Sequence, residues 1–366
     1  MLLTLLAALA IGYQAMAILA CVRAWRSAKQ RPGASGQGPA SVLKPIRGLD
    51  PALREAIQSH AVLRGDYEFL CGVSDPHDEA LPVLREFSKI RIVRAATLAA
   101  NGKVGTLIDL QAASQHPVLV VNDSDIRVQS DYLERVTAPL ADPSVGLVTC
   151  LYRPIGDTNA ARFEGLGVAT DFVPSTLVAR LLGVDEFAMG STLAFRRRDL
   201  ERIGGFAAIA DYLADDYQLG HRIHALGLKC VLSDVVVDTH MGGNWAHVWA
   251  HQVRWARTIR TVKYWGYLGL PVTNASLWAV IAGLSGRWEL AVTLLLVRFV
   301  MAWASGWLVI RSRDALRLLW LVPARDAYAF AVWLTGLAGR TVIWRGLRLR
   351  LDGDGKIMSE SNRMLE

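Results

Sequence analysis

Residues 118–128, VLVVNDSDIRV, combine a strongly apolar run with two closely spaced carboxylates. The first four residues are apolar without polar alternation, which is typical of a strand covered on both faces of a parallel sheet. Asp123 and Asp125 are therefore expected at the carboxyl end of a strand, where open α/β sheets bind ligands. Two neighbouring carboxylates repel each other, and a divalent cation with a phosphate beyond it relieves that repulsion. A metal site is one interpretation; the alternative is that Asp123 caps a turn and Asp125 is solvated.

Strand-like and helix-like segments alternate around this stretch, from residue 41 to about residue 240. We expect strands at 41–48, 68–75, 90–95, 118–128 and 145–152, with helices at 50–63, 102–114 and 130–142. Such alternation favours an α/β domain with a doubly wound, Rossmann-like sheet and right-handed crossovers.

The composition indicates a protein that is partly embedded in a membrane. Of the 366 residues, 52% are hydrophobic and 20% are charged, which is too apolar for an ordinary soluble enzyme and too charged for a fully embedded protein. Residues 2–22 carry no charge and are long enough to span a bilayer as a helix. The basic residues that follow, in a Gly/Pro/Ser-containing linker ending at residue 40, predict that the chain continues into the cytoplasm.

A second membrane region is expected after residue 266. Residues 267–284 and 290–310 are apolar enough to form a helical hairpin, and Arg298 inside the second segment is a modest functional hint. Residues 318–342 are interrupted by PARD, which predicts a re-entrant or interfacial segment. The expected organisation is a transmembrane helix (1–22), a basic flexible linker (23–40), an α/β domain (41–245), an interfacial helix (246–266), membrane helices (267–343) and a basic cytosolic tail (344–366).

Charge and cysteine content narrow the partners and the compartment. The net charge of +7 comes from basic residues beside apolar segments rather than from a basic stripe interleaved with aromatic residues. This pattern favours anionic lipid over nucleic acid as a partner. The four cysteines show no CxxC spacing, so we expect reduced, buried thiols in a cytosolic domain.

Further acidic residues are expected at the same edge of the sheet. Asp75 follows the strand at 68–75, and Asp216 lies in LADDYQLG. The carboxyl ends of these strands can converge on one crevice with Asp123 and Asp125. Each residue also has a simpler interpretation, since Asp75 suits a solvated turn and Asp216 suits a helix start.

The segment AHQVRWARTIR, residues 250–260, lies just before the membrane hairpin. On a helix, His251, Arg254 and Trp255 fall on neighbouring turns. Guanidinium groups at a membrane surface suit a diphosphate, because arginine offers forked donors to phosphate oxygens. The alternative is a basic amphipathic helix that only lies on anionic lipid.

Taken together, these motifs resemble the processive-type GT-A inverting glycosyltransferases, most closely the ceramide glucosyltransferase family. The resemblance rests on SVLKPIRGLDP, NDSDIRV, GSTLAFRRRDLERIGGF, LADDYQLG and VIWRGLRLRL, and extends nearly end to end. It is sharper to a bacterial branch that acts in hopanoid biosynthesis, through VPSTLVARLLG and HQVRWARTIR. That branch implies a GT-A fold and transfer of N-acetylglucosamine from UDP-N-acetylglucosamine to bacteriohopanetetrol. The rival within this class is a ceramide glucosyltransferase that uses UDP-glucose.

The resemblance implies roles for the residues of the donor side. Asp75 would accept hydrogen bonds from the uridine, and Lys103 in NGKVG would lie near the nucleotide. Asp123 and Asp125 match the DxD motif that holds Mg²⁺ or Mn²⁺ against the diphosphate.

On the acceptor side, Asp216 matches the general base that takes the proton of the acceptor hydroxyl. His251, Arg254 and Trp255 match the (Q/R)xxRW element, which in that family binds diphosphate and acceptor at the membrane surface. Here His251 replaces the usual Gln or Arg, and Gln252 comes one place late.

The resemblance also implies a multi-pass protein of the inner membrane with a cytoplasmic catalytic domain. A different class remains open, a non-catalytic lipid-binding membrane protein on the same scaffold. A processive polysaccharide synthase is disfavoured, because the C-terminal membrane region is too small to form a channel.

Overall fold

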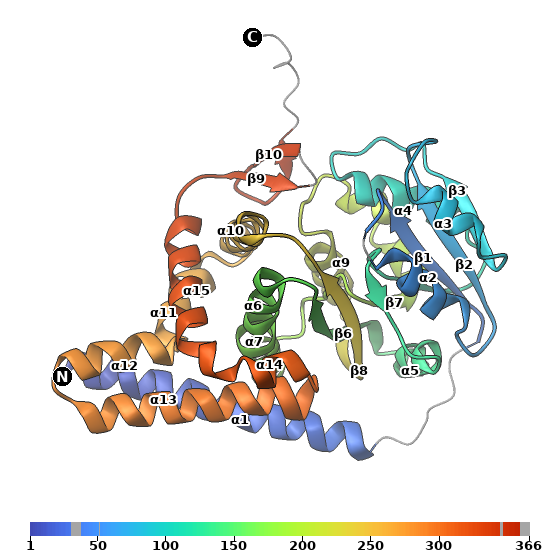
Figure 1. Ribbon diagram of the computed structural model, residues 1–366. Helices are drawn as coiled ribbons and strands as arrows, with labels where there is room; N and C mark the ends of the chain where they lie inside the picture. The colour runs from blue at the N-terminus through green and yellow to red at the C-terminus, as the bar shows by residue number, and fades with distance from the viewer. Residues whose placement is uncertain (31–37, 51, 345–346, 359–366) are drawn as a thin grey trace, which may run out of the picture.

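The α/β domain contains an eight-stranded mixed sheet with the strand order β3-β2-β1-β4-β7-β6-β8-β5 (Figure 1). The computed structural model describes residues 1–30, 38–50, 52–344 and 347–358. The central part of the expected linker, residues 31–37, and the end of the expected tail, residues 359–366, lie outside the described residues. The strands are β1 Ala40–Ile46, β2 Tyr67–Val73, β3 Ile90–Arg94, β4 Val118–Val121, β5 Ile126–Arg127, β6 Val145–Gly156, β7 Leu193–Arg196 and β8 Lys229–Met241.

The α/β prediction is confirmed, but two strands depart from parallel pairing: the inner strand β7, and the short edge strand β5, which runs antiparallel to β8. Strands β1 to β4 pair in parallel, as do β6 and β8. Strand β7 runs antiparallel between β4 and β6, and no strand was expected there. The chain reaches it through the helical excursion of residues 157–192, which returns from the opposite direction and so allows the reversed pairing.

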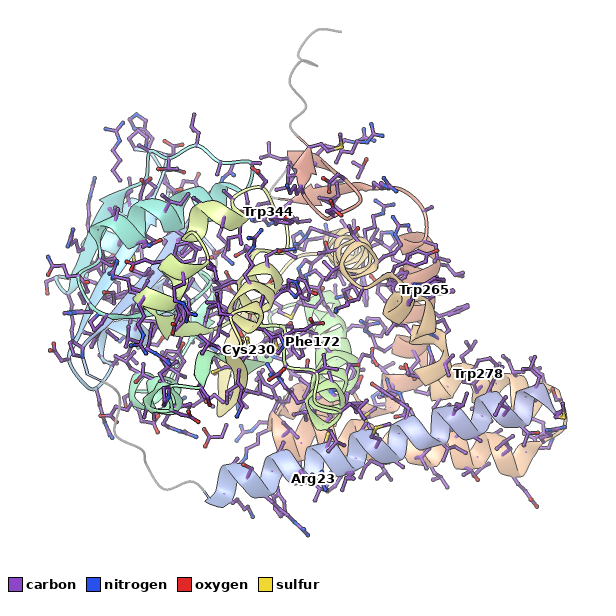
Figure 2. The ribbon with its side chains drawn as sticks, turned by 180° about the vertical axis from the view of Figure 1, so that it is seen from behind. Arg23, Phe172, Cys230, Trp265, Trp278 and Trp344 are labelled. Carbon is purple, nitrogen blue, oxygen red and sulfur yellow. The ribbon has the colours of Figure 1, made fainter. Side chains whose placement is uncertain are left out.

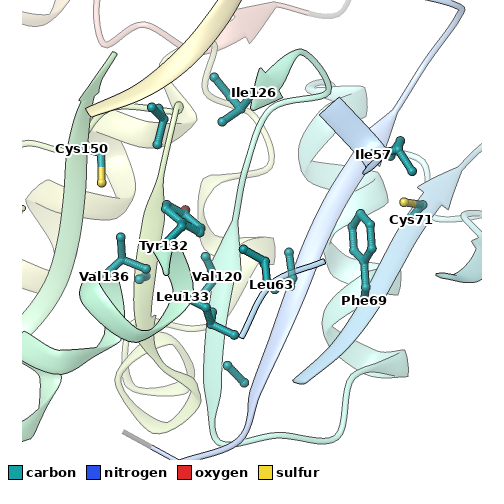
Figure 3. Packing of buried hydrophobic residues seen from close by; sticks show 14 of the residues in the cluster. Ile57, Leu63, Phe69, Cys71, Val120, Ile126, Tyr132, Leu133, Val136 and Cys150 are labelled. Atoms are coloured by element: carbon teal, nitrogen blue, oxygen red, sulfur yellow. The ribbon is translucent and has the colours of Figure 1, made fainter. Parts of the chain in front are cut away.

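Helices cover both faces of the sheet, and each face has its own apolar core. On one face, α2 (Leu53–Ala61) and α5 (Tyr132–Thr137) pack on β1, β2 and β4 (Figure 3). On the other face, α4 (Gly102–Ala113) and α9 (Asp215–Ala225) form a second cluster. Because both faces are covered, the strands read as continuous apolar runs rather than alternating ones.

Three apolar helices extend from the domain side by side (Figure 1): α1 (Leu2–Gln30), α12 (Ala275–Leu284) and α13 (Trp288–Trp303). By length and composition, Leu2–Lys29 and Trp288–Val309 can each cross a membrane. The expected first arm of the hairpin is not one helix, because α11 (Tyr264–Thr273) and α12 meet at an angle of 49°. Pro271 and the N-cap residue Asn274 explain the break.

PARD lies in the first turn of a helix rather than between two apolar segments, and the re-entrant or interfacial placement of residues 318–342 stays a prediction. Helix α15 (Val322–Gly336) starts there, since Pro323 occupies its first turn, where a missing N–H costs nothing. Arg325 and Asp326 are both buried.

Arg298 is also buried, and it joins α13 to two other parts of the chain. Its guanidinium donates to Asp326 Oδ2 at 2.9 Å, to Asp171 Oδ1 at 2.6 Å and to Thr170 O at 2.8 Å. Ser276 Oγ donates to the same Asp326 carboxylate at 2.5 Å. Arg298 therefore links membrane helices to the α/β domain, which is a structural role.

The remaining α-helices are α3 Leu81–Arg85, α6 Asn159–Gly167, α7 Val173–Leu181, α8 Arg197–Arg202, α10 Trp245–Val262 and α14 Arg313–Arg317. They complete the fold, and α6, α7 and α10 contribute residues to the cavity described below. The segment expected as a tail contains two strands, β10 (Leu347–Leu351) and β11 (Ile357–Met358), which form an antiparallel sheet with β9 (Thr341–Trp344). All four cysteines are buried and free, as expected.

Candidate active site

A cavity of about 1520 Å³ opens at the carboxyl end of β4 and extends along α10. Its lining includes the charged side chains Lys103, Asp123, Asp125, Asp215 and Asp216. It also includes aromatic side chains, of which Figure 2 labels Phe172, Trp265 and Trp344. A cavity lined by both charged and aromatic groups suits a ligand with a polar and an apolar end.

Asp216 lies in the first turn of α9, and backbone N–H groups hold its carboxylate on both sides. Gly190 N donates to Oδ2 at 2.8 Å, and Tyr217 N donates to Oδ1 at 2.8 Å. A Cβ placed on Gly190 would lie 3.5 Å from Asp216 Oδ2 and 3.0 Å from Asp123 Oδ2. The two carboxylates therefore converge on the same backbone position, as the sequence predicted for this edge of the sheet.

Lys103 sits between these acidic groups. Its ammonium group pairs with Asp123 Oδ1 at 2.8 Å and with Asp215 Oδ2 at 3.0 Å. Desolvation alone would lower the pKa of Lys103, but the charges of Asp123 and Asp215 outweigh it and raise the pKa above the ordinary lysine value. Asn101 caps α4 by accepting from Lys103 N at 3.1 Å, which fixes the start of the helix that carries the lysine.

Asp123 and Asp125 both line the cavity and suit a hard divalent cation. Desolvation and the charge of Asp123 raise the pKa of Asp125, so a cation would relieve this pair. Thr239 Oγ1 donates to Asp125 Oδ2 and orients the carboxylate. Among the described residues, no three His, Cys, Asp or Glu side chains form a metal-binding group. Two carboxylates together with substrate phosphates and water are nevertheless a usual Mg²⁺ environment.

Asp75 stands apart from these residues. Its side chain is exposed, and Oδ1 accepts a hydrogen bond from His77 N at 2.8 Å within the turn. The preceding residue, Ser74, lines the cavity, whereas Asp75 does not. The structure thus places Asp75 in the turn that was its simpler interpretation, one residue from the cavity wall.

His251, Arg254 and Trp255 line the cavity from α10, as their helical spacing predicted. The His251 ring lies 4.9 Å from the Trp255 ring, centroid to centroid. His251 Nδ1 is 2.6 Å from Glu164 Oε1. Since Nδ1 is engaged by Glu164, Nε2 is the ring nitrogen left to face a ligand.

Glu164 is the site residue that sequence reasoning missed. It is 1% exposed, lies on α6 and also accepts from Gln252 Nε2 at 2.8 Å. Gln252 Oε1 in turn accepts from Arg325 Nη2 at 3.0 Å. His251 and the late Gln252 are thus both held by one buried carboxylate. The only sequence signal was that Glu164 is the single charged residue in FEGLGVAT, residues 163–170. This signal is too weak to identify Glu164 as a site residue.

Several known proteins are similar to this chain in sequence or in fold. The chain is 26% identical over 203 residues to ceramide glucosyltransferase 1 of Caenorhabditis elegans, covering 53% of this chain and 43% of the relative. It is 25% identical over 218 residues to a beta-monoglucosyldiacylglycerol synthase of Synechocystis, covering 56% and 44%. The chain thus matches less than half the length of these curated relatives. The solved glucosyl-3-phosphoglycerate synthase of Mycobacterium tuberculosis has a TM-score of 0.36 at 18% identity, covering 60% of this chain and 73% of that one.

The family match extends over almost the whole chain. Residues 2–357 match Glycosyl transferase family 21, including the N-terminal helix, the mixed sheet and the C-terminal strands. The α/β domain accordingly has the GT-A-like fold that the sequence implied. The chain therefore belongs to glycosyl transferase family 21.

Proposed function

We propose that this protein is a membrane-bound inverting glycosyltransferase that moves a sugar from a UDP-sugar to a hydroxyl group of a lipid. One observation carries the proposal: Asp123, Asp125 and Asp216 line the same cavity as Tyr264 and Trp265 at the start of α11, which belongs to the bent pair of apolar helices. A water-soluble donor and a lipid acceptor can both reach such a cavity. The relatives named for glucosylated ceramide and diacylglycerol support a lipid acceptor.

In this mechanism Asp216 is the general base. Its carboxylate takes the proton from the acceptor hydroxyl while that oxygen attacks the anomeric carbon from the face opposite UDP, which inverts the configuration in one displacement. The N–H groups of Gly190 and Tyr217 hold the carboxylate in place for this attack. Asp123 and Asp125 would hold Mg²⁺ or Mn²⁺, which supplies charge stabilisation to the departing diphosphate. Arg254 and His251 would bind phosphate oxygens or the acceptor.

For the substrates, we propose UDP-N-acetylglucosamine as donor and a hopanoid, bacteriohopanetetrol, as acceptor, on the basis of the sequence resemblance. The second candidate is UDP-glucose with ceramide, which the two ceramide glucosyltransferase relatives favour. We place the protein in the inner membrane, with the cavity on the cytoplasmic side, in line with the basic residues Arg23, Arg26 and Lys29 in the C-terminal part of α1.

Thin-layer chromatography after incubation with labelled UDP-sugars tests this proposal. Vesicles containing bacteriohopanetetrol or ceramide are offered with labelled UDP-N-acetylglucosamine or UDP-glucose. We expect a labelled hopanoid from UDP-N-acetylglucosamine. Labelled glucosylceramide without a hopanoid product would overturn the substrate choice, and no labelled lipid in any combination would overturn the enzyme class. A labelled polymer would indicate a processive synthase.

The pH profile is expected to report the environment of Asp216. Desolvation of this partly buried carboxylate, followed by the charge of Asp215, raises the pKa of Asp216 to about 6. A general base must be ionised, so kcat/KM should be low below that pKa and should rise to a plateau as pH increases through about 6. Initial rates measured across the acidic and neutral pH range give this rise, the acidic limb of the pH profile. A limb near the ordinary aspartate value would contradict the assignment.

A further inference from the structure

The C-terminal strands lie directly against the loop that precedes Asp216. This loop, residues 210–214, leads into α9 without regular structure of its own beyond the short 3₁₀ turn before it. Ile357 N donates to Asp211 O at 2.7 Å, and Leu213 N donates to Gly355 O at 3.2 Å. Tyr212 and Lys356 form an antiparallel bridge between these two contacts. Strand β11 thus adds a backbone ladder to the loop.

Side chains reinforce the same contact. Leu213 packs with Val342, Leu351 and Ile357 in a small apolar cluster in which every member is at most 7% exposed. Burying four such side chains is worth several kcal/mol, enough to order a short loop. The loop therefore depends on residues about 130 positions further along the chain.

The other side of the loop is held by the helix that carries Lys103. Asn101 Nδ2 donates to Tyr212 O at 2.8 Å, and Asn101 N donates to Ala210 O at 2.8 Å. The loop is thus fixed between the N-terminus of α4 and strand β11. Asp215 and Asp216 follow it directly, so its position sets theirs.

The same C-terminal sheet is fastened to α10, the helix of His251 and Arg254 (Figure 1). Arg257 Nε donates to Ala338 O at 3.1 Å, and Arg257 Nη1 donates to Thr341 O. Arg260 donates to the carbonyl groups of Leu337 and Gly339. Two arginines of α10 therefore bind four main-chain carbonyl groups, three just before β9 and one at its first residue.

We infer that the C-terminal residues 337–344 and 349–358 act as a strap that positions the Asp216 loop relative to α10. Three contact sets carry this inference: the ladder from Gly355 and Ile357 to the loop, the apolar cluster around Leu213, and the arginine contacts to α10. The strap residues position the base rather than react, and this role rests on the proposed function of Asp216. The strap also supplies Ile343 and Trp344 to the cavity wall.

Leu351→Asp is the first test, with Leu347→Asp as its matched control. Both residues lie on β10, but Leu351 is 1% exposed in the cluster and Leu347 is 49% exposed. Leu351→Asp should release the loop and lower kcat about 100-fold, the scale of a misplacement of about 1 Å. The KM for the UDP-sugar should stay near that of the wild type, because Asp123 and Lys103 are held by other elements. Leu347→Asp should behave as the wild type, and Leu351→Ile should retain activity.

A second pair of variants avoids disturbing the apolar cluster. The Asp352 carboxylate accepts from Asp354 N at 2.9 Å and from Lys356 N at 2.8 Å, and so shapes the turn that leads into β11. Asp352→Ala removes these acceptors and should lower kcat by a smaller factor. Asp352→Asn keeps an acceptor oxygen in the same place and should restore most of the activity.

Hydrogen exchange of the peptide that contains residues 207–219 gives a readout that does not depend on activity. We expect faster exchange of this peptide in Leu351→Asp and Asp352→Ala. Exchange of the same peptide should not change in the controls Leu347→Asp and Asp352→Asn, and exchange of strands β1 to β4 should not change in any variant. Unchanged exchange in Leu351→Asp would overturn the strap, as would a loss of protection across the whole domain. If the wild type transfers no sugar at all, the proposed function fails, while the exchange result still decides whether the strap exists.

Discussion

Asp216→Asn is expected to reduce kcat for sugar transfer by about 10³-fold, within the range usual for removing a general base. Asparagine keeps the size of the side chain and an oxygen that can accept from one of the two N–H groups, Gly190 N or Tyr217 N. Its NH₂ group cannot accept from the other, and the amide cannot take a proton from the acceptor. The UDP-sugar should still bind, since Asp123 and Lys103 are unchanged. Steady-state rates and equilibrium binding of UDP to the detergent-solubilised protein measure the two effects separately.

Asp66→Asn is a matched control for this variant, because the Asp66 side chain is exposed outside the cavity. It should transfer sugar at the wild-type rate. Unchanged turnover in Asp216→Asn would reject Asp216 as the base. A loss of UDP binding in step with the loss of turnover would instead assign Asp216 to the donor site, and an inert wild type would favour the non-catalytic lipid-binding alternative.

Lys103→Met is expected to lower both stability and activity. The substitution leaves the carboxylates of Asp123, Asp215 and Asp216 close together without their ammonium partner. The Asp123 side chain is 39% exposed and solvent screens part of the charge, so the loss should cost about 1 to 3 kcal/mol, less than for a fully buried ion pair. The Lys103 charge also lowers the pKa of Asp216, so its loss should move the acidic limb of the pH profile above about 6. Thermal unfolding and the pH dependence of kcat/KM measure the two effects.

Lys229→Met provides the comparison, since Lys229 is exposed at the start of β8. A surface change of this kind should alter the unfolding free energy by no more than about 0.5 kcal/mol. Equal melting temperatures for Lys103→Met and Lys229→Met would show that the lysine is not needed to balance the acidic cluster. An acidic limb at the wild-type pH would show that it does not tune Asp216.

The sequence was sufficient to predict the sheet edge at which the candidate residues lie. The apolar run at 118–121 predicted β4, and the rule for strand ends placed Asp123 at the edge where a ligand can bind. Asp216 lies near it at the start of α9 rather than at the end of a strand, so strand order alone does not explain their convergence. Helical spacing likewise placed His251 and Arg254 on one face of α10. These predictions rest on local periodicity and on general rules of strand order.

Features that depend on distant contacts could not be predicted in this way. Strand β7 is reversed because of a helical excursion whose direction no local pattern encodes. Glu164 has no motif of its own and gains its role only where α6 meets α10. The residues of β10 and β11 look like a basic tail, because their apolar partner Leu213 lies far away in the sequence. Asp75 illustrates the opposite case, in which a local turn explains the residue.

The guanidinium of Arg298 has a mechanical consequence. It bonds at once to Asp326 on α15 and to Asp171 in the α/β domain, so a swivel of the domain about α13 would pull a buried charge away from its partners. Opening such a pair costs about 3 to 5 kcal/mol, several times the thermal energy. The α/β domain is therefore held in a fixed orientation relative to α13 and α15. Under the proposed function, a lipid acceptor would have to bring its hydroxyl group to Asp216, because the domain that carries this residue does not move toward the lipid.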